Sequence, residues 1–383
     1  MKNSKQHLND AFSSLQDAQI NLKHALDSAE KLNNKEREID GAVELIMHIL
    51  NSYNLTPDEY EFEGKTVGNY GPYIQSERKD IYHIVAKKLV QEGLAYPCFC
   101  SSEELTELRA QQETDGALIT GYFGKYAKCR DLTLEQIEDN LKANKSYVLR
   151  FRSEGKEDKR IMFEDMIRGK IEMPENVIDE VLLKSDGLPT YNFANVVDDH
   201  LMGITHVMRG LEYISSTPKY NLLYEALGWT PPVYIHMSPV MKDASRKLSK
   251  RHGDPGFEDL LAQGYVKDAI INFIALLGWC PDVKKYGEKE FFTMDELIEA
   301  FDLSGLSKSP AIFNTEKLIW FNHEYISKMD FEAYLEMATP WFDKVLAGKN
   351  IDYRMLASLM HTRTEIFSNV PEQVKVLAEL PAY

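Results

Sequence analysis

Two residue patterns divide this chain, and the boundary between them lies near residue 240. Up to about Met237, amphipathic helical stretches alternate with short apolar runs that have the composition of buried strands. After Asp254 only helical periodicity remains. Because helices that alternate with buried strands pack as layers on a sheet, the pattern predicts an α/β fold followed by an all-α region.

The helical stretches carry apolar residues at three- and four-residue spacing, which gathers them on one face. We expect helices over 5–32, 41–53, 79–92, 133–144, 257–262, 266–277, 294–301 and 331–338. We expect strands over 147–151, 181–183 and 206–208, with a tight turn at Asp186-Gly187. Ser76 is a candidate N-cap for the helix over 79–92.

The composition is that of a globular protein of two to four domains. The chain has 383 residues, 44% of them hydrophobic and 27% charged, and no apolar run long enough to cross a membrane is present. The first residues lead into no apolar segment of a signal peptide, and four cysteines in this length do not make a disulfide framework. We therefore expect a cytoplasmic protein.

A cluster of cations stands out in this acidic chain. The formal net charge is −16, yet Lys242, Arg246, Lys247, Lys250 and Arg251 fall within ten residues. One interpretation is a solvated basic loop. The other is a binding site for a polyanion such as a nucleotide triphosphate, pyrophosphate or RNA. The overall acidity argues against nonspecific coating of nucleic acid and leaves a specific RNA partner open.

A polar-rich segment, Gly187–Glu212, follows the predicted turn. Its Asp198, Asp199 and His200 allow a metal site, although three adjacent side chains point in different directions. The two aspartates also allow a helix cap. Both interpretations stay open at this point.

The order of residues in these segments resembles the glutamyl-tRNA synthetases of class I. Lys247-Leu-Ser-Lys250 is similar to the lysine-serine-lysine signature loop of class I aminoacyl-tRNA synthetases, and the run through Ala275-Leu-Leu-Gly-Trp279 is similar to the glutamyl enzymes in particular. The resemblance implies a glutamate–tRNA ligase. Such an enzyme uses ATP with Mg²⁺ to make glutamyl-adenylate and transfers the glutamyl group to tRNA-Glu, and we expect it to be a monomer.

The resemblance also implies roles for individual residues. The residues expected to face glutamate are Tyr191, Asn195 and Arg209. The residues expected to bind ATP are Glu212, Tyr213, Lys247, Ser249, Lys250 and Arg251. Lys250, and after it Lys247, are the catalytic candidates, because a lysine that closes on the departing pyrophosphate stabilises the transition state.

The cysteines form a second constellation. Cys98 and Cys100 lie about thirty residues before Cys129, and three cysteines are one ligand short of a tetrahedral zinc site. Some members of the family carry zinc here with a Tyr or His as the fourth ligand, so Tyr122 and Tyr126 are candidates. Three ordinary buried thiols are the alternative interpretation.

The resemblance covers Glu36 to the C-terminus and departs from the family pattern at both ends. Residues 1–34 do not match the phosphate-binding His-x-Gly-His-like motif, and about fifty residues follow Tyr334 where relatives have a larger anticodon-binding domain. We therefore expect a Rossmann-like parallel sheet that is incomplete at its N-terminal half.

The expected segments are a helix outside the family pattern (1–34), the rest of the first half of the catalytic domain (35–90), an inserted α+β tRNA acceptor-binding domain (91–186), the second half of the catalytic domain (187–245), the signature loop with stem-contact helices (246–328) and the start of a helical anticodon-binding domain (329–383).

A second function stays open on the sequence alone. A synthetase-like protein lacking the first ATP-binding motif would bind tRNA or nucleotide without aminoacylation. A tRNA-modifying relative that transfers glutamate fits less well, because such proteins resemble the catalytic half only and this chain continues past it.

Overall fold

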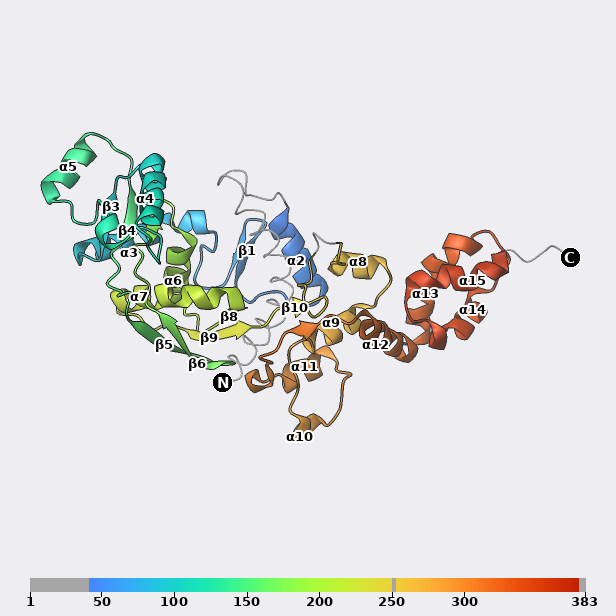
Figure 1. The fold of residues 1–383 in the computed structure, drawn as a ribbon. Coiled ribbons are helices and arrows are strands. Elements are labelled where there is room, and N and C mark those ends of the chain that lie inside the picture. Colours follow the sequence, from blue (N-terminus) through green and yellow to red (C-terminus); the bar gives the residue numbers. More distant parts are fainter. Residues whose placement is uncertain (1–40, 250–252, 379–383) are drawn as a thin grey trace. The chain divides into compact units, whose positions relative to one another are not determined.

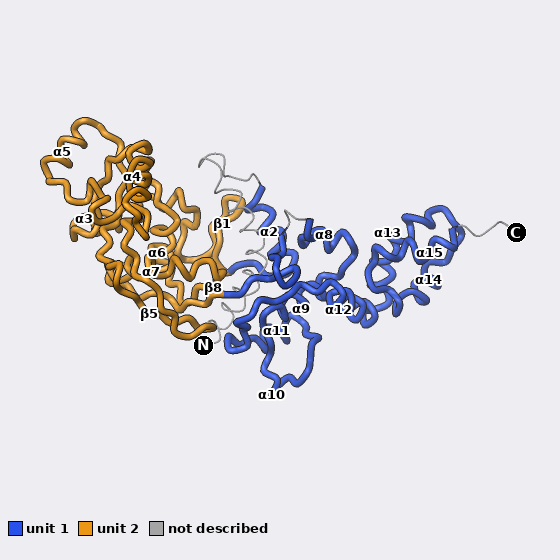
Figure 2. Tube along the Cα trace, viewed as in Figure 1, with its two compact units in different colours: residues 1–57, 237–383 blue, residues 58–236 orange. Residues whose placement is uncertain are grey.

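The computed structural model describes residues 41–249 and 253–378, and these divide into two compact units. One unit comprises 58–236, and the other comprises residues up to 57 together with 237–383 (Figure 2). The helix predicted over 5–32 lies outside the described residues. None of the helices in the described ranges is both long enough and apolar enough to span a membrane.

The unit 58–236 is a mixed α/β structure (Figure 1). Its helices are α3 (Lys79–Gln91), α4 (Ser102–Thr114), α5 (Leu134–Lys142), α6 (Tyr191–Leu201) and α7 (Thr217–Leu227). Its strands are β1 (Tyr60–Phe62), β2 (Lys65–Val67), β3 (Ala95–Cys98), β4 (Val148–Phe151), β5 (Arg160–Asp165), β6 (Gly169–Pro174), β7 (Val181–Leu183), β8 (His206–Gly210) and β9 (Val233–Met237).

Three sheets organise these strands. β1 and β2 form a hairpin, β3-β4-β7 is antiparallel, and the third sheet has the order β6-β5-β9-β8. Within the third sheet β5 and β6 are antiparallel, whereas β5 and β9 are parallel with Asp165 opposite Tyr234. This parallel pairing brings the end of β5 beside β9, which matters for the site described below.

Helices α3, α6 and α7 share one hydrophobic core with the three-stranded sheet. The core includes Tyr82, Leu89, Phe193, Val197 and Leu223. In α3 the buried residues recur every three or four positions, as an amphipathic helix requires. Burying such side chains contributes about 1.5–3 kcal/mol each, so this core fixes where α6 and its polar face lie.

The second unit is mainly helical, as the pattern after Asp254 predicts. Its helices are α2 (Ala42–Ser52), α8 (Phe257–Ala262), α9 (Lys267–Ala275), α10 (Val283–Tyr286), α11 (Met294–Ala300), α12 (Thr315–Lys328), α13 (Phe331–Leu346), α14 (Tyr353–Met360) and α15 (Val370–Ala378). Two short parallel strands, β10 (Val240–Met241) and β11 (Ala311–Ile312), complete it.

The structure corrects two local predictions. Ser76 does not cap α3: it lies within the 3₁₀ helix η1 (Gln75–Arg78), and Arg78 precedes α3 without a side-chain cap. The helix predicted to end at Ala338 continues through Pro340 to Leu346. Proline removes one helical hydrogen bond, but the burial of Phe342 and Leu346 beyond it favours continuing the helix.

Candidate active site

Helix α6 presents two of the residues expected to face glutamate. Thr190 fixes the start of α6, because its backbone N–H donates to Leu182 O at 2.9 Å and its hydroxyl donates to Val181 O at 2.6 Å. The helix buries its apolar face in the core, including Phe193 and Val197. Tyr191 and Asn195, one turn apart, lie outside that buried set.

Arg209, at the end of β8, is held by both hydrogen bonds and rings. Its Nε donates to His236 Nε2 at 3.1 Å and its Nη2 donates to Thr217 Oγ1 at 3.0 Å. Its guanidinium carbon lies 5.4, 4.9 and 5.1 Å from three aromatic ring centroids, those of Tyr213, Tyr220 and Tyr234. Rings at this distance attract a cation through their electron-rich faces.

The charge of Arg209 has no carboxylate partner within the described residues, where it forms no ion pair. Its Nη1 is likewise without a hydrogen bond to the part of the chain that the structure describes. A partly buried guanidinium with an open edge is suited to bind a carboxylate or phosphate through two parallel hydrogen bonds.

The two residues expected beside the nucleotide follow Arg209 closely in the sequence. Glu212 and Tyr213 lie in the 3₁₀ helix η3 (Leu211–Ser216), between β8 and α7. Glu212 is exposed, and the Tyr213 ring lies 6.1 Å from the Tyr191 ring. Tyr191, Arg209 and Tyr213 therefore lie close together within one unit.

The structure does not support either early interpretation of 198–200. Asp198 accepts from Arg78 Nε at 2.8 Å and from the Tyr82 hydroxyl at 2.7 Å, and His200 stacks on Trp229 at 3.9 Å. The three residues do not form one of the metal-ligand groups within the described ranges. They also sit at the C-terminal end of α6, so the aspartates cannot cap its N-terminus.

Asp199 points to a different environment from its neighbour. Burial raises the pKa of its carboxyl to about 6, against the opposing effect of the Arg209 charge, and Asp198 raises it further. This pKa is well above the ordinary value of about 3.9 for an aspartate.

The signature loop belongs to the other unit and starts as a small hairpin. Met241 and Lys247 form an isolated antiparallel β-bridge, and the Leu248 N–H donates to Val240 O at 3.2 Å. Asp254, whose side chain is 1% exposed, accepts from the Ser249 N–H at 2.9 Å and from Lys242. Lys247 is exposed at the end of this hairpin. Lys250 and Arg251 lie outside the described residues.

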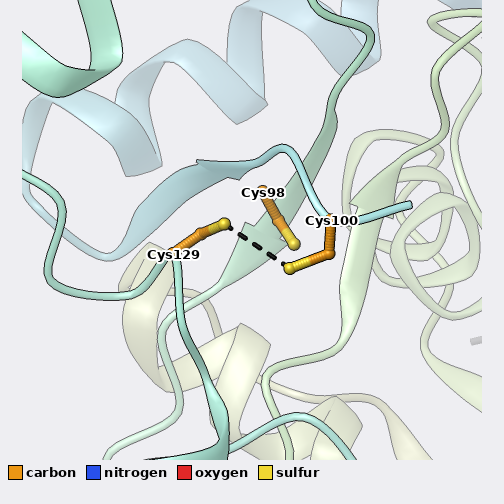
Figure 3. Close-up of side chains that lie close together, drawn as sticks. All are labelled: Cys98, Cys100 and Cys129. Atoms are coloured by element: carbon orange, nitrogen blue, oxygen red, sulfur yellow. Dashed lines mark hydrogen bonds between the residues drawn. The ribbon is translucent and has the colours of Figure 1, made fainter. Parts of the chain in front are cut away.

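The three cysteines predicted as zinc ligands do converge (Figure 3). Their sulfur atoms all lie within 4.8 Å of one another, and the Cys100 and Cys129 sulfurs are 3.6 Å apart. Cys98 ends β3, while Cys129 follows the 3₁₀ helix η2 (Gly124–Tyr126). Cys280 is exposed and belongs to the other unit.

Of the two candidate tyrosines, only Tyr122 reaches the sulfurs. Its hydroxyl lies 3.3 Å from Cys100 Sγ and accepts from the Cys129 N–H at 2.9 Å. The Tyr126 hydroxyl instead donates to Asp115 at 2.8 Å. A hydrogen bond from Cys129 lowers the pKa of Cys98, burial raises that of Cys100, and the contact with Cys98 raises that of Cys129.

A cavity of about 650 Å³ lies elsewhere in the same unit, beside β5 and β9. It is lined mainly by β5 residues, the segment 231–234 and Asn221, and none of the residues predicted from the sequence is among them. Two of its lining residues, Asp165 and Tyr234, nevertheless also belong to the surroundings of Arg209.

Comparison with known families places this geometry in a class. Residues 33–320 match the family model of "tRNA synthetases class I (E and Q), catalytic domain". The match includes α6, Arg209 and the lysine-containing loop. The fold and site thus define a class I aminoacyl-tRNA synthetase.

Individual relatives narrow the class. The chain is 49% identical over 351 residues to a glutamate–tRNA ligase of Clostridium botulinum (strain Eklund 17B / Type B), spanning 91% of this chain and 69% of the relative. It is 48% identical to the glutamate–tRNA ligase of Clostridium tetani, with the same shares covered. A crystal structure of a glutamate tRNA ligase from Elizabethkingia meningosepticum in complex with its amino acid is 34% identical, with a TM-score of 0.79 over 89% of this chain and 71% of that one. The chain therefore belongs to the glutamate–tRNA ligase family.

Proposed function

We propose that this chain activates glutamate with ATP and transfers it to tRNA-Glu, and that Arg209 recognises a glutamate carboxylate. The observation that supports this best is the open Nη1 edge of a guanidinium whose other atoms are bonded within the protein. A substrate carboxylate would supply the hydrogen-bonded partner that Nη1 lacks among the described residues, where Asp199 interacts electrostatically with Arg209 without forming an ion pair.

Neighbouring residues complete the proposed pocket. Tyr191 and Asn195 offer polar side chains on the same side of α6, and glutamate has an amino group and two carboxylates to bind. Tyr213 presents an aromatic ring suited to stacking on adenine, with Glu212 beside it. These are roles that the family resemblance assigns to the matching positions.

The proposed reaction has two steps. An oxygen of the glutamate α-carboxylate attacks the α-phosphorus of ATP, the bond from that phosphorus to the bridging oxygen breaks, and pyrophosphate leaves. A hydroxyl at the 3′ end of tRNA then attacks the glutamyl carbonyl, and AMP leaves. ATP enters as its Mg²⁺ complex. Arg209 acts by holding the amino acid so that its α-carboxylate meets ATP.

The lysine loop acts on the leaving group. Negative charge grows on pyrophosphate as it departs, so a lysine that closes on it lowers the barrier. We assign this role to Lys250 from the sequence, with Lys247 second and with Ser249 and Arg251 as further ATP contacts. Supporting this, Asp254 and the 241–247 hairpin hold Ser249 and Lys247 in a defined loop.

We also propose that Cys98, Cys100 and Cys129 hold a zinc ion, with Tyr122 as the fourth donor. Three thiols within 4.8 Å form the soft ligand set that zinc prefers, and the Tyr122 hydroxyl lies beside them. Zinc would cross-link β3 to the segment after η2 and carry no part of the reaction. The further expectation of a monomer rests on the family resemblance, and that of a cytoplasmic protein rests on the composition.

Glutamate-dependent exchange between ATP and pyrophosphate tests the function directly. The wild-type chain is expected to show exchange, and Arg209→Ala is expected to lower it on the order of 10²–10³-fold, the usual loss on removing one preorganised donor. Arg160→Ala, an exposed arginine of β5, serves as the control. Filter binding to tRNA runs alongside, since binding without exchange would favour the alternative of a tRNA-binding protein that does not aminoacylate.

A further inference from the structure

Two buried polar residues behind Arg209 have no part in the reaction as described above. Asp165 ends β5 and His236 lies in β9, and both side chains are 0% exposed. The parallel pairing of these strands places the two side by side although they are 71 residues apart in sequence. Buried groups of this kind are costly unless fully hydrogen-bonded.

Asp165 is saturated with donors. Its Oδ1 accepts from the N–H groups of Ile167 and Arg168 at 3.0 and 2.8 Å. Its Oδ2 accepts from the His236 N–H at 2.9 Å and lies 2.7 Å from His236 Nδ1. Burial opposes the charge of Asp165, but the hydrogen bond from His236 and those from the backbone outweigh it and lower its pKa.

This arrangement decides where the proton of His236 sits. A carboxylate only accepts, so Nδ1 carries the hydrogen. Nε2 faces Arg209 Nε, which only donates, at 3.1 Å, so Nε2 must present its lone pair. Asp165 therefore selects the Nδ1–H tautomer that Arg209 requires.

Thr217 fixes a second nitrogen of the same guanidinium. Its hydroxyl, fully buried, accepts from Arg209 Nη2 at 3.0 Å and donates to Tyr213 O at 3.1 Å. With Nε and Nη2 both bonded, rotation of the guanidinium is blocked and Nη1 points to a set direction. A donor held in place before binding loses little freedom when the carboxylate arrives.

We propose that Asp165 and His236 are positioning residues for glutamate binding: Asp165 holds His236 in the Nδ1–H tautomer, and Nε2 of His236 orients Arg209 toward the substrate carboxylate. The inference rests on the proposed role of Arg209. It adds two residues that touch no substrate and that lie in strands distant from the polar segment 187–212.

A pair of histidine replacements tests the proposal. Asparagine offers a donor near the position of Nδ1 and no acceptor near that of Nε2. His236→Asn should therefore keep the contact with Asp165 and lose the hydrogen bond from Arg209 Nε. Glutamine offers an acceptor near the position of Nε2, so His236→Gln restores an orienting contact. We expect His236→Asn to weaken glutamate binding about 10- to 100-fold, the range for partners that orient a ligating group, and His236→Gln to recover most of it. His206→Asn, on the same strand as Arg209, is the control and should match wild type.

The measurements are the calorimetric Kd for glutamate, KM for glutamate and for ATP in the exchange assay, and the melting temperature, all on the full chain. Orientation predicts a change confined to glutamate, with KM for ATP and the melting temperature equal in the two His236 variants. Equal glutamate affinity in wild type and His236→Asn, with Arg209→Ala losing it, would overturn this inference and leave the proposed function intact. If the wild type binds glutamate but shows no exchange, and His236→Asn binds glutamate less well, the proposed function would be overturned and this inference would stand. A wild type that neither binds glutamate nor shows exchange would overturn both the proposed function and this inference.

Discussion

The Arg209 site and the cysteine cluster lie in the same unit but differ in how well the protein satisfies them. At Arg209, Nε and Nη2 meet acceptors, and the acceptor His236 is itself fixed by Asp165. At the cluster, the Cys100 and Cys129 thiols chiefly contact each other and the Tyr122 hydroxyl. Thiols are weak donors and weak acceptors, so these contacts contribute little.

The difference indicates what each site gains from a ligand. The Arg209 site is already ordered, and a carboxylate needs only to complete it. The cluster holds three ionisable sulfurs that a cation would convert to thiolates, so metal binding there would release protons and tie together β3 and the segment after η2. At the Arg209 site, the order that exists before the ligand binds should therefore matter for catalysis. At the cysteine cluster, the order that the metal creates on binding should matter for stability.

The largest expected effect comes from Arg209→Lys. Lysine keeps the charge but has no planar fork, so it cannot bond His236 and Thr217 and still offer two hydrogens to a carboxylate. We expect kcat/KM for glutamate to fall on the order of 10²–10³-fold, measured by exchange. Arg160→Lys, an exposed arginine of β5, is the control; a lysine variant with wild-type kcat/KM would show that charge alone suffices at Arg209.

At the cluster, Cys98→Ser removes the most buried of the three sulfurs, 1% exposed. We expect the purified wild type to contain about one zinc per chain and the variant to bind zinc about 100-fold less tightly, at least as much as losing an outer partner of a metal ligand costs. Elemental analysis and competition with a chromogenic chelator measure this. Cys280→Ser, which replaces an exposed cysteine, should retain zinc and serves as the control. A wild type that is purified without metal and is as stable without zinc as with it would contradict the zinc proposal.

These two sites also show what the sequence can and cannot predict. Tyr191, Arg209, Tyr213 and the three cysteines can be proposed as site residues from the sequence, because they lie in segments that resemble family motifs. α6 was missed as a helix because Pro189 and several polar residues obscure its apolar face of Phe193, Val196 and Val197. A closer count of that spacing would have found it.

Asp165 and His236 are a harder case. In β5 the residues alternate in burial, but the innermost position at the end is an aspartate, which disguises the strand pattern. His236 lies in the apolar run Val233–Met237, and a histidine there must have a buried partner, yet nothing in the sequence says which one. Only the parallel pairing of β5 and β9 brings the two together. Residues that act through another side chain are in general dispersed in this way.

A smaller effect concerns Asp199, whose pKa of about 6 reflects burial opposed by the Arg209 charge. Between about pH 4 and 6 the unfolded chain loses this proton before the folded chain does, so rising pH lowers the free energy of unfolding. The loss reaches about 3 kcal/mol above pH 6. Asp199→Asn has no carboxyl group to titrate at this position. Its free energy of unfolding relative to wild type, measured by urea titration, should therefore rise between pH 4.5 and 6.5 and then level off. A flat difference for Asp199→Asn across this range would exclude the raised pKa.

The smallest effect separates Tyr122 and Tyr126, two tyrosines of the same core whose hydroxyl groups are both hydrogen-bonded. Tyr122→Phe loses the bond from the Cys129 N–H at 2.9 Å, and Tyr126→Phe loses the bond to Asp115 at 2.8 Å. Without zinc, each loss should lower the free energy of unfolding by about 1 kcal/mol. With zinc the pair should diverge, because only the Tyr122 oxygen reaches the sulfurs: zinc affinity should fall about tenfold in Tyr122→Phe and stay unchanged in Tyr126→Phe. Equal zinc affinity in both variants would mean that Tyr122 is not the fourth donor. The Tyr122 hydroxyl would then serve only to accept the Cys129 N–H, and the cluster would resemble the Arg209 site in being ordered by contacts within the protein.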